Sequence, residues 1–202
     1  VFVDCFLKSD DNNAIDQASE TVSDIGVLFS FVQDKDIFRA HYKLRLAKRL
    51  LQFKYNEDLE LQVLEQMQKQ SGKHFIHKFE GMINDVRVAE SIQTKFEEAK
   101  VQGLPCAFSI KVLTFAYWPQ IKPDDSFVSP DSLRQCQDGF ERYYRRFNPT
   151  KQLKWQAERG SPVLDIAFPK GTKEVNMNIH QAAVMIQIDS GALLPNGGSS
   201  TQ

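Results

Sequence analysis

The stretch DKDIFRAHYKLRLAKRLL, residues 34–51, decides how the rest of the chain is interpreted. From Ile37 to Asn56 there is no Asp or Glu, although the whole chain carries 26 acidic and 25 basic residues. Six bases alternate there with apolar residues: Arg39, Lys43, Arg45, Lys48, Arg49 and Lys54. A stretch of this kind can be a surface for nucleic acid or an acidic partner, a membrane helix, or one side of a packed helical bundle.

Helical geometry favours the packed bundle. At about 100° per residue the bases are spread around much of the helix circumference, whereas phosphate recognition needs them clustered on one side. Long basic stems can instead lie over apolar neighbours while their charged heads stay in water. Apolar and amphipathic residues run along one broad side: Ile37, His41, Leu44, Lys48 and Leu51, widened by Phe38, Tyr42, Leu46 and Leu50. A basic helical nucleic-acid-binding domain remains the alternative.

The composition indicates a chain with a sizeable core. It is 42% hydrophobic and contains 15 Phe, which suggests layers of packed rings. A net charge of −1 argues against a general polyanion binder. Three cysteines fit reduced thiols in the cytoplasm or nucleus better than a disulfide framework. The first residues lack a basic leader, and no apolar run approaches the ~18 residues of a membrane span, so we expect no membrane association.

Further helices are predicted in the first half. Apolar residues from Ile15 to Phe29 follow 3-4 spacing, and another helix is expected after Asn56, with Leu61, Leu64 and Met67 inward and a stop at Ser71-Gly72. The pattern continues through Phe75 and Phe79, and a separate helix is expected around Ile92–Ala99. Short links between helices predict an antiparallel bundle over residues 1–104, its first helix incomplete.

The second half changes to a strand pattern. Phe108, Ile110 and Val112 alternate with polar residues, which predicts a strand over residues 107–116. Ser129 and Pro130 predict a helix start. Three short strands are expected after that helix, at Leu153–Trp155, Leu164–Phe168 and Val175–Ile179. The predicted fold class is therefore α+β: a helical bundle, then a small, mainly antiparallel sheet domain over residues 105–189 with one or two helices, then a flexible tail over residues 190–202.

Candidate catalytic groups are few. His74 and His77 are three residues apart, so a helix could place both imidazoles on one face, with Glu80 and Asp85 nearby, but a metal site needs further ligands. Cys106 and Cys136 fit small packed residues better than nucleophiles. No phosphate-binding glycine loop or nucleophile elbow occurs. We expect no enzyme, no metal and no cofactor, and a thiol or metal enzyme ranks behind the other hypotheses.

Five blocks, taken together and in order, resemble the cullin family. In residues 34–51 the shared pattern comprises Asp34, Lys35, Asp36, Phe38 and the bundle signature Tyr42, Leu46, Ala47, Arg49, Leu50 and Leu51. SGKHFIHKFEGMINDV, residues 71–86, is similar to the family's run through Gly72, Phe75, Lys78, Glu80, Gly81, Met82 and Asp85. VLTFAYWP (112–119), FERYYRRFNPTKQLKW (140–155) and IHQAAVMI (179–186) supply the other three blocks.

This resemblance implies a function as a scaffold. Cullins are the elongated, non-catalytic scaffolds of cullin–RING ubiquitin ligases, and their α/β domain takes in a strand of the RING-box subunit, which recruits a ubiquitin-conjugating enzyme. The resemblance implies the middle of a cullin, without the adaptor-binding repeats and the winged-helix region. Regulators of the ligase are candidate partners for the basic helix. The expected strand-addition site comprises Ile110, Val112, Thr114, Phe115, Trp118, Trp155, Leu164, Ile166, Phe168, Val175, Met177 and Ile179.

Overall fold

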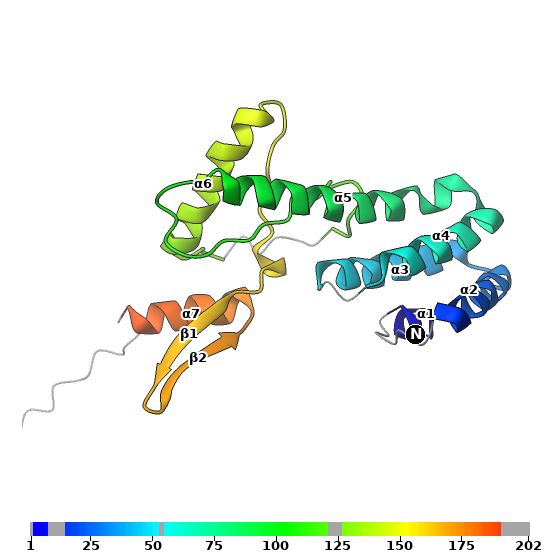
Figure 1. The fold of residues 1–202 in the computed structure, drawn as a ribbon, viewed down its shortest axis with the longest axis horizontal. Coiled ribbons are helices and arrows are strands. Elements are labelled where there is room, and N and C mark those ends of the chain that lie inside the picture. Colours follow the sequence, from blue (N-terminus) through cyan, green and yellow to red (C-terminus); the bar gives the residue numbers. More distant parts are fainter. Residues whose placement is uncertain (1, 8–14, 53–54, 121–126, 191–202) are drawn as a thin grey trace, which may run out of the picture. The chain divides into compact units, whose positions relative to one another are not determined.

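The computed structural model describes residues 2–7, 15–52, 55–120 and 127–190. They form two compact units, of which the first comprises Val1–Glu98 and Ser109–Gln120 and the second comprises Ala99–Phe108 and Ile121–Gln202. The α+β fold class is confirmed, since the first unit is helical and the second holds an antiparallel sheet (Figure 1). The predicted boundary at 104/105 stays a prediction, and the predicted tail lies outside the described residues apart from Ser190.

The first unit is built from amphipathic helices. Their bounds are α1 Phe2–Phe6, α2 Ile15–Ser30, α3 Lys35–Leu51, α4 Glu57–Ser71 and α5 Lys73–Glu98. Helix α4 lies against both α2 and α5, and α3 lies against α5. The separate helix expected near Ile92 is wrong, because α5 runs unbroken for 26 residues. No proline or helix stop interrupts the sequence between Met82 and Glu98.

Local chemistry explains where α4 begins and ends. The Asn56 side chain accepts a hydrogen bond from the backbone N–H of Leu59 (3.2 Å), which caps the first turn. Gly72 ends the helix with φ 79°, a left-handed conformation that favours glycine, and this confirms the predicted stop. In the second unit the helix start predicted at Ser129 and Pro130 is confirmed, since α6 spans Asp131–Phe147 with Pro130 at its N-cap position, although Ser129 does not cap it.

Aromatic rings form a continuous layer in the core of the first unit. Ring centroids are 5.1 Å apart between Phe29 and Phe38, 5.5 Å between Phe29 and Phe75, and 5.0 Å between Tyr42 and Phe79. These rings come from α2, α3 and α5, so the layer joins helices that are distant in sequence. The expected packing of phenylalanines into layers is confirmed here.

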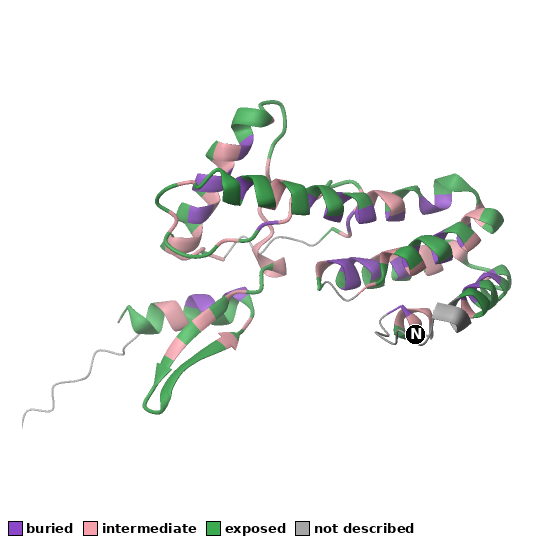
Figure 2. Ribbon diagram, in the orientation of Figure 1, coloured by how far each residue is buried: buried purple, intermediate pink, exposed green. Residues whose placement is uncertain are grey.

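The buried face of α3 is narrower than predicted. Tyr42, Leu46, Ala47, Arg49 and Leu50 are buried and Leu51 is half-buried (Figure 2). The same helix leaves the side chains of Ile37 and Leu44 60% and 57% exposed. On α4, Leu61 is exposed and Glu60 is fully buried instead. Leu64 and Met67 of α4 are buried as predicted, and charged residues, not only apolar ones, occupy the inner faces of both helices.

The described residues of the second unit form one hairpin and two longer helices. After α6 come the short 3-10 helix Ala157–Arg159, β1 Val163–Phe168, β2 Gly171–Asn176 and α7 Ile179–Asp189. The strands pair antiparallel, with Leu164 opposite Val175 and Ile166 opposite Lys173. The predicted strand Leu164–Phe168 is confirmed. The predicted strand Val175–Ile179 is wrong beyond Asn176, because Asn178 and Gln181 form a capping box that begins α7 at Ile179.

Two other predicted strands do not form. Residues 107–116 carry no strand assignment, because the backbone N–H groups of Ile110 and Thr114 donate to the side chains of Gln93 and Asp85 rather than to a neighbouring strand. Leu153–Trp155 is also irregular. Trp155 packs its ring against Phe140 and donates its indole N–H to Glu141 (2.8 Å). Side-chain partners have therefore replaced the expected ladders.

Candidate partner-binding site

One carboxylate of α5 accepts three hydrogen bonds from the 109–120 segment. Asp85 Oδ2 accepts hydrogen bonds from the Thr114 backbone N–H (2.7 Å) and the Trp118 indole N–H (2.8 Å), and Oδ1 accepts one from the Thr114 hydroxyl (2.8 Å). Asp85 is buried and so is Trp118, whose ring joins the core of the first unit. Three donors on one buried carboxylate fix both the position and the register of this segment.

The start of the segment is anchored at two further points. Gln93 Oε1 accepts from the Ile110 backbone N–H at 2.9 Å. Lys111 Nζ donates to the carbonyl of Leu51 at 3.0 Å, at the C-terminal end of α3. This cation satisfies a helix-end carbonyl and interacts favourably with the helix dipole. Burial lowers the pKa of Lys111, an effect that the charge of Glu90 partly offsets.

Five residues of the expected strand-addition site belong to this unit. Ile110 and Trp118 are buried and Val112 is half-buried, whereas Thr114 is exposed and Phe115 is 61% exposed. Trp118 packs into the core of its own unit. Only the exposed members present side chains to a partner without repacking. The irregular backbone of residues 107–114 shows that this segment is not one of the two strands of the described sheet.

The other seven residues of the expected site lie in the second unit. Leu164, Ile166, Val175, Met177 and Trp155 are half-buried, Phe168 is exposed, and Ile179 is buried in the first turn of α7. Leu164 and Val175 are paired across the hairpin, so their side chains share one face, and Ile166 lies on that face two residues along β1. The hairpin therefore has one apolar, half-buried face and one exposed face.

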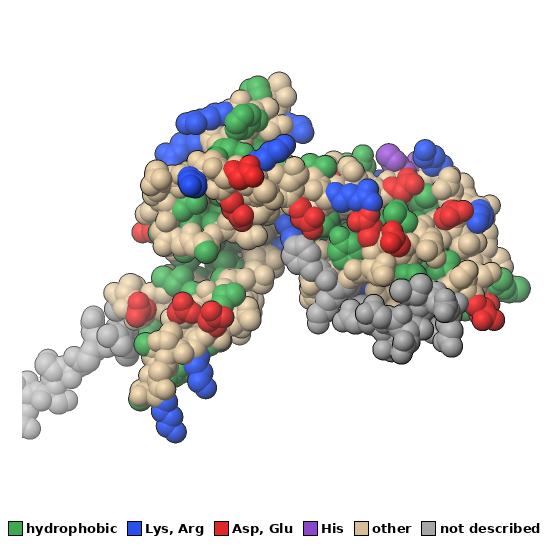
Figure 3. Space-filling view, viewed as in Figure 1, with side chains coloured by type: hydrophobic (Ala, Val, Ile, Leu, Met, Phe, Trp, Pro, Cys, Tyr) green, Lys and Arg blue, Asp and Glu red, His purple; other side chains and the backbone are tan. Residues whose placement is uncertain are grey.

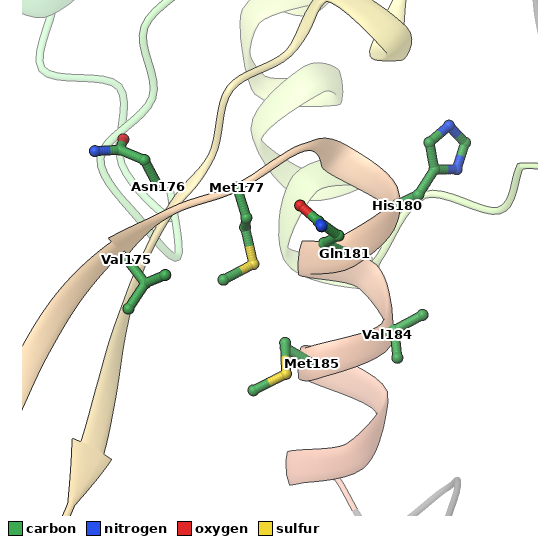
Figure 4. A pocket seen from close by; sticks show the side chains of 7 residues that line it. All are labelled: Val175, Asn176, Met177, His180, Gln181, Val184 and Met185. Carbon is green, nitrogen blue, oxygen red and sulfur yellow. The ribbon is translucent and has the colours of Figure 1, made fainter.

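An apolar pocket of about 560 Å³ lies between β2 and α7 (Figure 4). Met177 and Met185 lie in the space between strand and helix. The remaining lining residues are Val175, Asn176, His180, Gln181 and Val184. Methionine side chains adapt to differently shaped apolar surfaces, so such a pocket suits the side chains of a bound peptide.

The bundle signature contains a buried ion-pair network. Arg49 and Glu60 are both 0% exposed, and Arg49 Nε donates to Glu60 Oε1 at 2.5 Å. Arg49 Nη1 donates to Asp4 Oδ1 at 2.5 Å, and the Tyr42 hydroxyl donates to Glu60 Oε2 at 2.8 Å. The network joins α1, α3 and α4. Arg49 is therefore not a solvated stem, as the pattern of bases suggested, but the centre of the packing between these helices.

Burial and neighbouring charges shift the pKa values of Arg49 and Tyr42 in this network. Burial alone lowers the pKa of Arg49, but the hydrogen bond and charge of Glu60 outweigh it and the net pKa is raised. Burial, together with the charge of Glu60, raises the pKa of Tyr42 well above 10.0. Arg49 also leaves its Nη2 atom buried without a hydrogen-bond partner. The raised pKa values of Arg49 and Tyr42 thus favour a charged Arg49 and a neutral Tyr42 in this network.

The raised pKa of Tyr42 predicts a loss of stability in alkali. Above pH ~10 the unfolded tyrosine releases its proton while the folded one keeps it, so the free energy of unfolding falls by about 1.4 kcal/mol per pH unit. Tyr42→Phe should flatten this slope in urea titrations between pH 9 and 11. Tyr144→Phe, a buried tyrosine of the second unit, is the matched control. An unchanged slope in Tyr42→Phe would contradict the assignment.

The outer face of α3 is a mixed surface. Arg39 pairs with Asp36 (2.9 Å) and Arg45 pairs with Asp4 (3.6 Å). Basic and acidic side chains are interspersed on the face of this unit seen in Figure 3. Burial and the neighbouring charge of Lys78 lower the pKa of Lys43. Two bases of this face, Arg39 and Arg45, are thus paired with acids, whereas Lys43 lies beside another base.

The histidine pair lies in a basic setting. His74 and His77 line a pocket of about 350 Å³ together with three bases, Arg39, Lys43 and Lys78, and one acid, Asp36. Cationic neighbours oppose the binding of a metal cation. Among the described residues there is no group of three or more His, Cys, Asp or Glu side chains that could hold a metal. Asp85, expected as a neighbour of this pair, instead binds the 109–120 segment.

The two candidate thiols lie together in the second unit. Cys106 is exposed, Cys136 is buried on α6, and their Sγ atoms are 3.6 Å apart. Burial and the Cys106 thiol raise the pKa of Cys136 from 9.0 to about 11. Cys136 is therefore a packed thiol, as the sequence indicated, and little of it is thiolate at neutral pH. The same expectation is wrong for Cys106, which is exposed.

Sequence reasoning missed the buried acids. Glu60 was not identified, and its signal is an acid at a position where the apolar spacing of Val63, Leu64 and Met67 continues. Asp85 was noted as a residue of the family pattern and as a possible companion of the histidines, but not as the anchor of the 109–120 segment. Gln93 carried no local signal, because its role depends on a segment 17 residues away.

The chain matches two families of protein domains. Residues 1–93 match the Cullin alpha solenoid domain, and residues 112–192 match the Cullin alpha+beta domain. Cullin-4 of Schizosaccharomyces pombe is 35% identical over 85% of this chain and 23% of its own length. Human Cullin-4A is 31% identical over 94% of this chain and 25% of its own length, and Cullin-1 of Oryza sativa is 31% identical over 92% and 26%. The chain spans about a quarter of these relatives, and it belongs to the cullin family.

Proposed function

We propose that this chain is part of the non-catalytic scaffold subunit of a cullin–RING ubiquitin ligase. Its second half binds a RING-box subunit by strand addition, and through that subunit a ubiquitin-conjugating enzyme. The scaffold holds the RING-box subunit at a fixed distance from the substrate-adaptor arm, which raises the effective concentration of donor and substrate. The proposal places the complex in the cytoplasm or the nucleus.

The observation that carries the proposal is the hairpin of β1 and β2. It is the only sheet among the described residues and has two strands. The outer edge of each strand therefore has no neighbouring strand in the described part of the chain. An isolated two-stranded hairpin is marginally stable, and a third strand supplies both hydrogen bonds and packing. A peptide strand added to either edge would meet the half-buried apolar face of Leu164, Ile166 and Val175.

The pocket beside β2 supports the same mode of binding. In strand addition the backbone supplies affinity, while pockets for alternate side chains supply specificity. The pocket lined by Val175, Met177 and Met185 lies next to β2, one of the two strands whose edge a peptide could extend (Figure 4). An apolar side chain of the added strand fits that lining.

The first unit contributes stiffness to the proposed scaffold. A fixed distance between partners requires helices that do not shift against one another. The buried pairs of Arg49 with Glu60 and Asp4 join α1, α3 and α4, and the aromatic layer joins α2, α3 and α5. Close packing of this kind holds the helices in one relative position.

Co-expression with a RING-box subunit tests the proposal. The intact RING-box subunit should co-purify with the 202-residue chain. A subunit that keeps its RING but lacks the N-terminal strand should not co-purify. Ile166→Asp should weaken co-purification by about tenfold or more, because it places a charge on the apolar face. Asp165→Asn, an exposed neighbour on the opposite face of β1, is the matched control and should bind normally.

Two outcomes would overturn the proposal. If the truncated subunit co-purifies as well as the intact one, strand addition is wrong. If the chain fails to bind the subunit and instead binds nucleic acid with an affinity that falls steeply with salt, the scaffold function itself is wrong.

A further inference from the structure

Two cysteines of the second unit lie within reach of a covalent bond. Their Sγ atoms are 3.6 Å apart, although 30 residues separate Cys106 from Cys136. A disulfide requires ~2.05 Å, so the sulfurs need to approach by a distance that side-chain rotation and small backbone shifts supply. Cys106 is exposed and Cys136 is fully buried. One thiol is thus open to an oxidant in solution and the other is sheltered behind it.

The packing around α6 holds the two thiols in this arrangement. Gly139, one turn along the same helix face, lies so close to Leu104 that an added Cβ would be 3.0 Å from Leu104 Cδ2 and 3.9 Å from Val101 Cγ1. The segment from Val101 to Cys106 therefore lies directly over the face of α6 that carries Cys136 and Gly139. The small glycine permits this close approach, which brings Cys106 to its partner.

We propose that Cys106 and Cys136 are a redox pair that forms a reversible intramolecular disulfide under oxidation by a peroxide. The Cys106 thiolate attacks hydrogen peroxide: an S–O bond forms, the O–O bond breaks, and hydroxide leaves and takes up a proton to form water. The Cys106 sulfenic acid is then attacked at sulfur by Cys136. The S–S bond forms, the S–O bond breaks, and the departing hydroxide takes the proton released by Cys136. Two thiols and one peroxide give one disulfide and two waters.

The order of the two steps follows from the surroundings of each sulfur. Oxidants reach the exposed Cys106 first. Cys136 is buried and its pKa is raised to about 11, so little of it is thiolate at neutral pH and it reacts only when an electrophilic sulfur is placed beside it. Cys136 therefore acts as the resolving thiol.

The disulfide has a local structural consequence. It ties residues 101–106 covalently to the middle of α6, at a contact that otherwise rests on apolar packing of Leu104 and Val101 against Gly139. Detachment of this segment from the helix, by local unfolding, should become rarer in the oxidised protein.

Peroxide treatment of the Cys5→Ser protein, followed by mass spectrometry, tests the pair. The exposed Cys5 is removed because it offers a competing thiol. The expected products are a loss of two hydrogens from the intact mass, a peptide linking Cys106 to Cys136, reversal by dithiothreitol, and proteolysis within residues 99–108 slowed about tenfold. With Cys136→Ala added, Cys106 should accumulate as a sulfenic acid that dimedone traps.

Two results would overturn the proposal. One is equal trapping of Cys106 by dimedone whether or not Cys136 is present. The other is a disulfide between two chains instead of within one. Since Cys136→Ala removes a buried side chain, Cys106→Ser, an exposed position, provides the second variant. It should abolish the cross-link and leave Cys136 unmodified by peroxide while the protein stays folded.

Discussion

Arg49→Ala is expected to lower the free energy of unfolding of the first unit by about 3–5 kcal/mol. The substitution leaves the Glu60 carboxylate buried without its cation and removes a partner of Asp4. An unpaired buried charge is far less stable than either the ion pair or an apolar replacement. The loss should exceed that of any single apolar truncation on the exposed side of α3.

Tryptophan fluorescence in urea can measure this effect in one unit at a time. The chain has two tryptophans, Trp118 in the first unit and Trp155 in the second. A Trp155→Phe background therefore reports unfolding of the first unit alone. The matched control is Arg45→Ala, which removes an exposed arginine 3.6 Å from the same Asp4 and should change stability by less than about 1 kcal/mol.

A double variant separates loss of the pair from loss of volume. In Arg49→Ala with Glu60→Ala, the second substitution removes the stranded carboxylate, so the combined loss should be smaller than the sum of the two single losses. Strict additivity, or a loss below about 1 kcal/mol for Arg49→Ala, would show that the network does not hold the unit together.

Asp85→Ala is expected to release the 109–120 segment and to lower stability by about 3 kcal/mol. It removes the acceptor of three hydrogen bonds and leaves the Trp118 indole N–H buried without a partner. The Trp118 emission should shift to longer wavelength as water reaches the ring, and amide exchange at Thr114 should accelerate.

Glu98→Ala is the matched control for Asp85. Glu98 is an exposed acid on the same helix. Glu98→Ala therefore removes one negative charge from α5, as Asp85→Ala does, but leaves the hydrogen bonds to the 109–120 segment in place. Its stability should stay within about 0.5 kcal/mol of the parent. If Asp85→Ala leaves the Trp118 emission unchanged, the segment is held by its apolar contacts and not by the carboxylate.

Local sequence patterns were sufficient to predict most helices of the chain. The 3-4 spacing of apolar residues gives α2, and the turn at Gly72 separates α4 from α5, because both depend on neighbours within a few residues. The hairpin strand Val163–Phe168 follows from the alternation of Leu164 and Ile166. Family membership also follows from the sequence, since five short blocks keep their order along the chain.

Patterns of strand type were less informative in the second half. Alternation at residues 107–116 predicts a strand, but a strand also needs a neighbour that accepts and donates along its edge. In the structure Gln93 and Asp85 take the N–H groups of Ile110 and Thr114. The candidate residues could be named from the sequence. The sequence did not show which of them are buried anchors, such as Trp118, and which are exposed, such as Phe115.

The sequence by itself determined the helical character of the first unit, the first strand of the hairpin and the cullin family. Only the tertiary structure decided what the bases of residues 34–51 do. Arg49 looked like one more member of a basic helix, but it lies 11 residues from Glu60 and 45 from Asp4 in sequence and bonds to both. A helix fixes which of its residues share a face, and the partner across that face depends on packing with distant segments. Arg49 is accordingly a buried link between helices, while Arg39 and Arg45 remain on the surface.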